Sequence, residues 1–272
     1  MMNDIRIDPL EIDSAYPPDM HSLFIENRLL GLVFLANGKG PHPTVILLHG
    51  FPGNEKNLDV AHMLRRGGYN VLVFHYSGSW GSRGSYSFGQ AYRDLQAIRS
   101  AVGGESFARE HRIDRSQIYL AGHSVGGFLT MLAARDQMDF VGFASLAPYN
   151  LSLQAKRIGA CEAGAREETL DLLSGGLNPL YGASAESLFT EVMENREKWD
   201  LLGSDAPYRG KKILLVVASS DIVAPPAVHH RPLAETILRA SEHGTVVTLD
   251  CSHDFSEKRV TLGQTLFDWL ES

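Results

Sequence analysis

The sequence predicts an α/β protein built on a mostly parallel sheet, because short apolar runs alternate with longer helical patterns along most of the chain. The apolar runs are rich in branched residues and lack polar/apolar alternation, which is typical of strands covered by helices on both faces. The chain has 272 residues, of which 44% are hydrophobic and 21% charged. This composition supports a sizeable core and excludes disorder, collagen and a coiled coil, while the length fits one large domain or one domain with an insertion.

The first half of the chain begins with a predicted antiparallel hairpin, in which residues 22–26 and 29–35 flank Asn27-Arg28. A turn-rich stretch at 37–43 follows. The predicted strands and the helices that follow them are then 44–48 with 58–66, 71–76 with 88–102, and 118–121 with 126–135. A strand, a helix and another strand in this order indicate parallel pairing.

The second half interrupts this alternation. After a predicted strand at 140–146, residues 149–208 show helical spacing and no convincing strand, so we interpret them as a helical cap inserted into a domain formed by 1–148 and 209–272. Two apolar stripes support these helices: Leu170, Leu173 and Leu177, and Leu188, Val192 and Trp199. The insertion is either a packed helical cover or a lid that faces a substrate. The sheet resumes with predicted strands at 213–218 and 245–249 and helices at 226–240 and 260–270.

Charge and cysteine content restrict the partners. With 25 Lys and Arg against 32 Asp and Glu, the net charge is −7, and no basic stripe occurs, which argues against nucleic acid or an anionic membrane as the main partner. Cys161 and Cys251 are too few for a disulfide framework and lack C-x-x-C spacing. The acidic N-terminus lacks the apolar segment of a signal peptide, and no apolar run is long enough to cross a bilayer. We therefore expect a cytoplasmic protein with a small-molecule partner and no membrane partner.

One motif, Gly122-His123-Ser124-Val125-Gly126, follows the predicted strand at 118–121 and opens the next helix. The G-x-S-x-G pattern is weak evidence alone, because glycine and serine are common residues. Its context is specific, however: a serine on a sharp strand-to-helix turn presents its hydroxyl above the sheet, and the crowded turn requires glycine two residues to either side. The alternative is an ordinary serine in a surface loop.

A serine hydroxyl is a poor nucleophile near pH 7, so it needs a histidine to take its proton and a carboxylate to orient that histidine. Asp221 lies just beyond the predicted strand at 213–218, and His253 lies beyond the strand at 245–249. The order is therefore Ser124, Asp221, His253, with each residue at the carboxyl end of a strand. We predict that these three residues form a catalytic triad.

Other histidines and aspartates compete for these roles. His49, His75 and His123 also lie at strand ends, but they precede or neighbour Ser124, so loop hydrogen bonding and packing are their expected roles. His229 and His230 lie on a predicted helix, where a solvated or hydrogen-bonded histidine is the simpler interpretation. Two carboxylates, Asp250 and Asp254, are too close to His253 in sequence to reach its far ring nitrogen readily.

An anionic tetrahedral intermediate needs two preorganised N–H donors. The amide of Val125, directly after the nucleophile, is one candidate. The second is the amide of Phe51, in the loop after the strand at 44–48, because Pro52 has no N–H and Gly50 and Gly53 permit a tight turn. The alternative is that this H-G-F-P-G segment is only a turn.

From Thr44 to the C-terminus, through H-G-F-P-G, G-H-S-V-G-G, Asp221 and His253, the sequence resembles the α/β-hydrolase superfamily. Residues 74–84 are similar to a loop of feruloyl-type carboxylesterases and prolyl-oligopeptidase-like catalytic domains. The resemblance implies a catalytic domain (1–148 and 209–272) with a mostly parallel sheet of about eight strands, helices on both faces, a helical cap (149–208) after strand six and no cofactor. The chain departs from the peptidase branch at Val125, where that branch often has tyrosine, and before Thr44, where no propeller fits.

Motifs for two other chemistries, nucleotide binding and metal catalysis, do not occur in the sequence. The glycines at 78, 81 and 84 are spaced G-x-x-G-x-x-G, which matches neither the dinucleotide fingerprint nor a phosphate-binding loop. No H-E-x-x-H motif or cluster with metal-ligand spacing occurs. We therefore expect an enzyme without cofactor or metal.

The predicted function is a serine hydrolase, a carboxylesterase that cleaves esters of small molecules through an acyl-enzyme on Ser124. One alternative is a serine peptidase or acylaminoacyl-type amidase, although no paired acidic clamp for a substrate ammonium was found. The other is a non-catalytic small-molecule binding protein. Four residues are candidates for an apolar substrate pocket, with ordinary packing as the alternative: Leu151, Leu153, Tyr181 and Trp199. The oligomeric state is unknown from the sequence.

Overall fold

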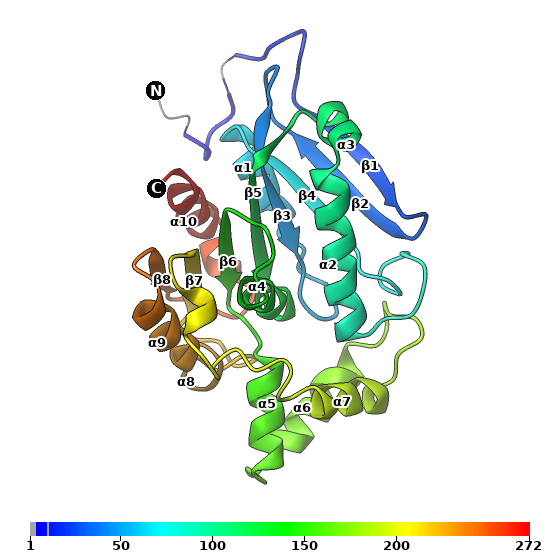
Figure 1. The fold of residues 1–272 in the computed structure, drawn as a ribbon, viewed down its shortest axis with the longest axis vertical. Coiled ribbons are helices and arrows are strands. Elements are labelled where there is room, and N and C mark those ends of the chain that lie inside the picture. Colours follow the sequence, from blue (N-terminus) through cyan, green and yellow to red (C-terminus); the bar gives the residue numbers. More distant parts are fainter. Residues whose placement is uncertain (1–3, 10) are drawn as a thin grey trace.

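A computed structural model describes residues 4–9 and 11–272 of the chain. These residues contain a sheet of eight strands in the order β1-β2-β4-β3-β5-β6-β7-β8 (Figure 1). The strands are β1 (Asp19–Ile25), β2 (Leu29–Leu35), β3 (His42–Leu48), β4 (Asn70–Phe74), β5 (Ile113–His123), β6 (Gly142–Leu146), β7 (Lys212–Ala218) and β8 (Gly244–Leu249). The strands β1 and β2 form the predicted antiparallel hairpin, β2 pairs antiparallel with β4, and all other pairs are parallel, as predicted.

The helices follow the predicted alternation. They are α1 (Leu58–Arg66), α2 (Phe88–Gly103), α3 (Glu105–Glu110), α4 (Val125–Arg135), α5 (Leu151–Gly159), α6 (Ala165–Gly175), α7 (Ala185–Glu194), α8 (Pro226–His229), α9 (Arg231–Ala240) and α10 (Arg259–Glu271), with short 3-10 turns at Ala206–Tyr208 and Ser256–Lys258. The short helix α3 was not predicted. In the described ranges, no helix combines the length and apolar character that spanning a membrane requires.

Two apolar layers cover the two faces of the sheet. Along β3, Val45 and Leu47 pack with apolar residues of α1 and α10, whereas Ile46 and Leu48 pack with those of α2, α4 and α9. This division follows from the two-residue period of a strand, which sends successive side chains to opposite faces. Burial on both faces explains why the central strands β3, β4 and β7 are continuous apolar runs.

One predicted helix was wrong in its extent. Residues 226–240 form two helices, because the chain breaks between α8 and α9 at His230. Pro232, in the first turn of α9, has no N–H to donate to the carbonyl of Val228, and its ring would clash with that carbonyl in a continuous helix. The break places His229 and His230 in the interior, each below 2% exposed.

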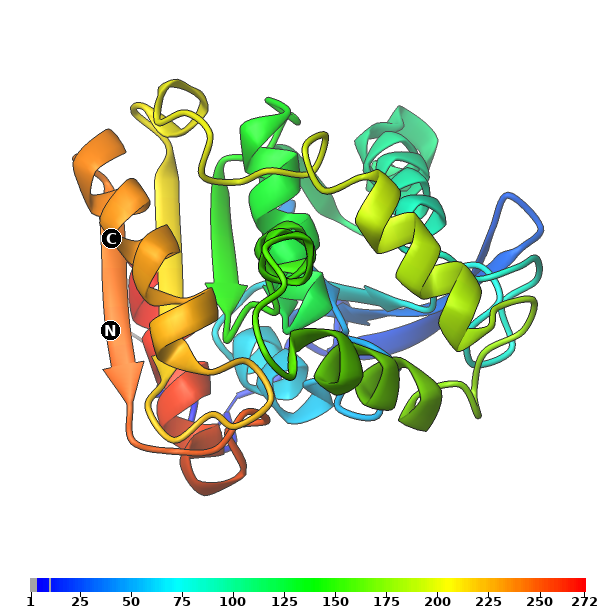
Figure 2. The same cartoon turned by 90° about the horizontal axis from the view of Figure 1, so that it is seen from below.

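The segment between β6 and β7 contains α5, α6 and α7, which we call the inserted helices. Figure 1 shows them together at one end of the molecule, and Figure 2 shows this end face-on. The Glu191 carboxylate of α7 accepts hydrogen bonds from the N–H groups of Phe88 and Gly89, at 2.8 and 3.0 Å. This bond pair uses two free N–H groups at the start of α2 and ties the inserted helices to the sheet domain.

Candidate active site

Ser124 occupies a sharp turn between β5 and α4, as the G-x-S-x-G motif predicted. Its backbone has φ 57° and ψ −121°, a conformation that non-glycine residues adopt at some cost. A Cβ atom on Gly122 would lie 2.2 Å from the Gly126 carbonyl oxygen, and one on Gly126 would lie 2.6 Å from the His49 carbonyl oxygen. The turn therefore closes only with glycine at both positions, and it holds the serine in place.

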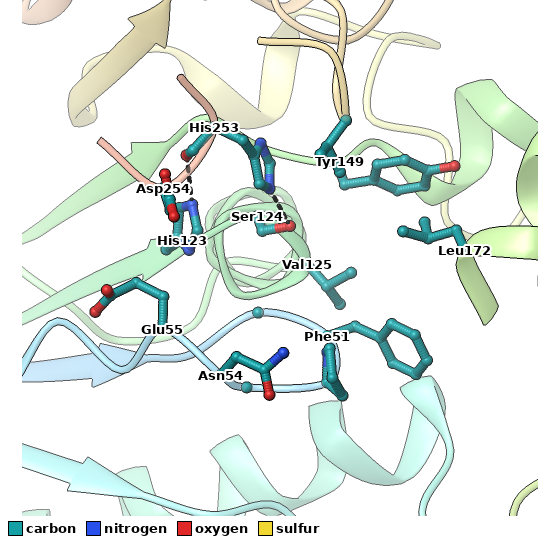
Figure 3. Close-up of a pocket in the computed structure, with 14 residues that line it drawn as sticks. Phe51, Asn54, Glu55, His123, Ser124, Val125, Tyr149, Leu172, His253 and Asp254 are labelled. Carbon is teal, nitrogen blue, oxygen red and sulfur yellow. Dashed lines mark hydrogen bonds between the residues drawn. The ribbon is translucent and has the colours of Figure 1, made fainter. Parts of the chain in front are cut away.

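The three residues of the predicted triad lie in hydrogen-bond contact. His253 Nε2 is 2.9 Å from Ser124 Oγ, and His253 Nδ1 is 2.6 Å from Asp221 Oδ2 (Figure 3 shows the serine–histidine bond). Since a carboxylate only accepts, Nδ1 carries the proton toward Asp221, and neutral Nε2 faces the serine hydroxyl as an acceptor. In this arrangement the imidazole can take the serine proton.

Asp221 is buried and its carboxylate is fully hydrogen-bonded. The second oxygen, Oδ1, accepts the backbone N–H groups of Val223 and Ala224 at 2.9 and 2.8 Å. Burial raises the pKa of Asp221, but the bond from His253, the charge of that imidazole and the Ala224 amide outweigh burial and hold the pKa below its usual value. The carboxylate is therefore ionised at neutral pH and stabilises a proton on His253.

His123 connects the serine turn to the histidine loop. Its Nε2 donates to the His253 carbonyl oxygen at 2.8 Å, and the two rings lie 4.9 Å apart (Figure 3). Burial lowers the pKa of His123 to about 3, so the ring is neutral. A loop hydrogen bond was the role expected for His123. The sequence did not indicate the partner of this bond, because His253 is 130 residues away along the chain.

His229 and His230 lie next to the site. His229 Nδ1 accepts the N–H of Asn150 at 3.0 Å, and its ring stacks on Tyr149 at 4.5 Å, so this histidine is hydrogen-bonded as expected. His230 Nε2 is 3.9 Å from Asp221 Oδ2. Burial lowers the pKa to about 3 for His229 and to about 4 for His230. Both rings are neutral at pH 7, and His230 is the one that lies beside the Asp221 carboxylate.

The two residues predicted to supply the oxyanion donors, Phe51 and Val125, both line the cavity beside Ser124. The N–H of Val125 is the first of α4, and the first N–H groups of a helix have no partner within it. The loop after β3 passes close to the serine: a Cβ on Gly50 would lie 2.7 Å from Ser124 Cβ and 3.3 Å from its Oγ. Glycine thus brings the neighbouring Phe51 amide toward the nucleophile, and the roles of Phe51 and Val125 remain predictions.

A cavity of about 440 Å³ opens above Ser124. Figure 3 shows that its labelled lining residues divide into two sides: Phe51, Val125, Tyr149 and Leu172 on one, and Asn54, Glu55, His123 and Asp254 on the other. Val223 also lines it. The volume falls in the range typical of small-molecule sites. Among the described residues, no group of three or more His, Cys, Asp or Glu side chains could hold a metal ion.

The four predicted pocket residues do not line this cavity. Leu151 and Trp199 are buried in the core that the inserted helices share with the sheet domain, which is the packing alternative. Leu153 is half-buried on α5, and Tyr181 is 75% exposed. These four residues were predicted to line the pocket from their apolar character alone. The packing of the inserted helices on the sheet domain places other side chains at the cavity.

Three apolar lining residues were not predicted from the sequence: Tyr149, Leu172 and Val223. Two of them carried a usable signal, because Tyr149 lies three residues beyond β6 and Val223 follows Asp221 by two residues, both at carboxyl ends of strands. Leu172 carried none, because it lies beside the stripe of Leu170 and Leu173 and reaches the cavity only through the orientation of α6.

The fold and the Ser-His-Asp arrangement define an α/β-hydrolase. The model of the alpha/beta hydrolase family matches residues 45–260, and the chain belongs to this family.

Solved structures with the same fold include the following. The esterase Pf2001 of Pyrococcus furiosus has a TM-score of 0.65 at 17% identity, with 97% of each chain covered. The monoacylglycerol lipase of Paleococcus ferrophilus has a TM-score of 0.63 at 19% identity, with 89% of this chain and 98% of that chain covered. A puromycin hydrolase has a TM-score of 0.66 at 21% identity, with 97% of this chain but 40% of that chain covered. At these identities the similarity establishes the fold alone.

Proposed function

We propose that this protein is a serine hydrolase, a carboxylesterase that cleaves esters of small molecules through an acyl-enzyme on Ser124. The observation that carries the proposal is the continuous hydrogen-bond chain from Asp221 through His253 to Ser124. It ends at a serine that lines a cavity of about 440 Å³. The esterase and lipase among the structures of the same fold agree with this proposal.

The first half-reaction forms the acyl-enzyme. Ser124 Oγ attacks the ester carbonyl carbon while His253 Nε2 takes the hydroxyl proton, and Asp221 stabilises the resulting imidazolium. The negative charge on the carbonyl oxygen is stabilised by the N–H groups of Phe51 and Val125. When the carbon–oxygen bond to the alcohol breaks, His253 gives its proton to the leaving oxygen.

The second half-reaction reverses these roles. Water enters on the side that the alcohol has left, His253 takes one of its protons, and the hydroxide attacks the acyl carbon. The bond to Ser124 Oγ then breaks, and His253 returns the proton to that oxygen. Asp221 remains ionised throughout, in agreement with its lowered pKa.

The alternative of an aminopeptidase-like amidase requires carboxylates on the acyl side, where they would bind a substrate ammonium. The leaving group must lie beside His253, which protonates it, so the acyl group lies on the opposite side of Ser124. In Figure 3 the carboxylates Glu55 and Asp254 lie on the same side of the cavity as His123, and apolar side chains line the other side. We assign the first side to the leaving group, because Asp254 follows His253 directly, and the apolar side to the acyl group. This distribution favours ester hydrolysis over cleavage of free aminoacyl amides.

The test compares Ser124→Ala with Ser174→Ala, a matched change at an exposed serine of α6. We expect p-nitrophenyl butyrate hydrolysis and fluorophosphonate labelling to disappear in Ser124→Ala and to persist in the control. Parallel assays with aminoacyl p-nitroanilides separate the amidase. Undiminished hydrolysis by folded Ser124→Ala would contradict the mechanism, and a folded wild-type protein that is neither active nor labelled would favour a non-catalytic binding protein.

A further inference from the structure

The end of α6 packs directly on the ring of Phe51. Gly176 caps this helix and is buried, and a Cβ atom on it would lie 2.2 Å from Phe51 Cε1 and 2.6 Å from Cζ. The glycine has φ −97°, a value that any residue adopts, so its backbone does not require glycine. What requires glycine at this position is the contact with the Phe51 ring.

Two aromatic rings of the core also lie beside the ring of Phe51. Its centroid lies 6.0 Å from that of Tyr86 and 5.7 Å from that of Phe88, and both of these residues are buried in the core. Phe51 therefore contacts both the end of the inserted helix α6 and the aromatic core of the sheet domain. Because protein interiors are close-packed and Phe51 lines the cavity, we expect a larger side chain on the α6 side to displace the ring toward the cavity.

Phe51 belongs to the apolar side of the cavity, with Tyr149 and Leu172 (Figure 3). On the proposed mechanism this is the acyl side, because His253 and the departing alcohol occupy the other. The loop of Phe51 also supplies one proposed oxyanion N–H, so the start of the acyl chain lies close to this residue. The position of the ring therefore limits how far an acyl chain extends from Ser124.

We propose that the Phe51 ring, held in place by Gly176 at the end of α6, is the wall that sets the acyl-chain length this enzyme accepts. The substrate class is an ester of a short aliphatic acid with a polar alcohol, which faces Asn54, Glu55 and Asp254. This inference rests on the proposed function of Ser124. It assigns the inserted helices a specificity role through one backbone contact.

The test measures kcat/KM for p-nitrophenyl acetate, butyrate, hexanoate and octanoate in Gly176→Ala and in Gly175→Ala. Gly175 is the matched control, because it is the preceding residue, is exposed, and a Cβ there would meet no atom within 4 Å. We expect Gly176→Ala to lower kcat/KM for hexanoate by about tenfold relative to acetate, and Gly175→Ala to leave the ratio unchanged. An unchanged ratio in Gly176→Ala, or an equal loss for all four esters, would overturn the proposal.

A second variant tests the ring itself. Phe51→Ala keeps the backbone N–H but removes the wall, so we expect kcat/KM for octanoate to rise at least tenfold relative to acetate. In the double variant, Gly176→Ala should no longer alter the chain-length ratio, because its effect requires the ring. If Gly176→Ala has the same effect with and without the ring, the contact is not the determinant. Circular dichroism and the melting temperature establish that each variant is folded.

Failure of the inference is distinguishable from failure of the proposed function. Suppose that the wild-type protein hydrolyses esters, that Ser124→Ala does not, and that substitutions at residues 51 and 176 leave the dependence of kcat/KM on chain length unchanged. Then only the inference is wrong. If no ester is hydrolysed, the affinity of the same esters for the Ser124→Ala variant, measured by calorimetry, still tests whether the Phe51 ring limits the acyl-chain length. Binding that does not depend on Gly176→Ala in that background would then overturn the inference as well.

Discussion

Mild acid should destabilise this protein steeply, because several buried histidines are neutral in the folded state. Burial lowers the pKa to about 3 for His49, His123 and His229, and to about 4 for His230. All four are below 5% exposed. The positive charges of Lys56, Arg259 and Arg157 also lower the pKa of His49, His123 and His229, respectively. The negative charge of Asp221 raises the pKa of His123, His229 and His230, but by less than burial lowers it.

The sign and size follow from proton linkage. In the unfolded chain each histidine titrates near pH 6.5, so below that pH the unfolded state binds protons that the folded state does not, and stability falls as pH falls. At pH 5.5 each of the four contributes about 1.2 kcal/mol per pH unit. Together they lower the free energy of unfolding by about 5 kcal/mol between pH 7.5 and 5.5, which is comparable to the total stability of many domains.

The assay is urea unfolding followed by circular dichroism at half-unit steps from pH 5.5 to 7.5, with linear extrapolation to water. We expect a slope near pH 5.5 of about 5 kcal/mol per pH unit, equivalent to uptake of three to four protons. His123→Gln should reduce this slope by about one proton, and the control His243→Gln, at an exposed side chain, should leave it unchanged. A wild-type slope of one proton or less would refute the reasoning.

Two further predictions concern the triad. Asp221→Asn should lower kcat by about three to four orders of magnitude, because its side-chain NH2 would face His253 Nδ1 and favour the wrong tautomer. Kinetics at pH 7 to 9 test this, and a loss below tenfold would contradict the assigned role. His123→Phe removes the donor to the His253 carbonyl, so kcat should fall about tenfold to a hundredfold at unchanged KM. His123→Gln keeps a donor and should recover most activity; equal losses in both variants would count against this bond.

The fold was predictable because its signals are local. Covered parallel strands are apolar runs, so β3, β4 and β7 were recognised within one or two residues of their bounds. The partly exposed edge strand β8 was recognised equally well from its branched residues. The break at His230 was not predicted, because the helical pattern of 226–240 continues across Pro232 and suggests one helix. The helix α3 was missed because it is one short segment next to α2.

The amino-acid sequence by itself determined which three side chains meet above the sheet. Parallel strands end at the same edge, so Ser124, Asp221 and His253, each placed just beyond a strand, necessarily converge there. Only the tertiary structure decided which side chains surround them. Leu172 reaches the cavity while Leu151 and Trp199 are buried elsewhere, and Phe51 is held by Gly176 from another part of the chain. Amphipathic spacing specifies that a helix has an apolar face, but the packing of the whole helix specifies where each residue of that face lies.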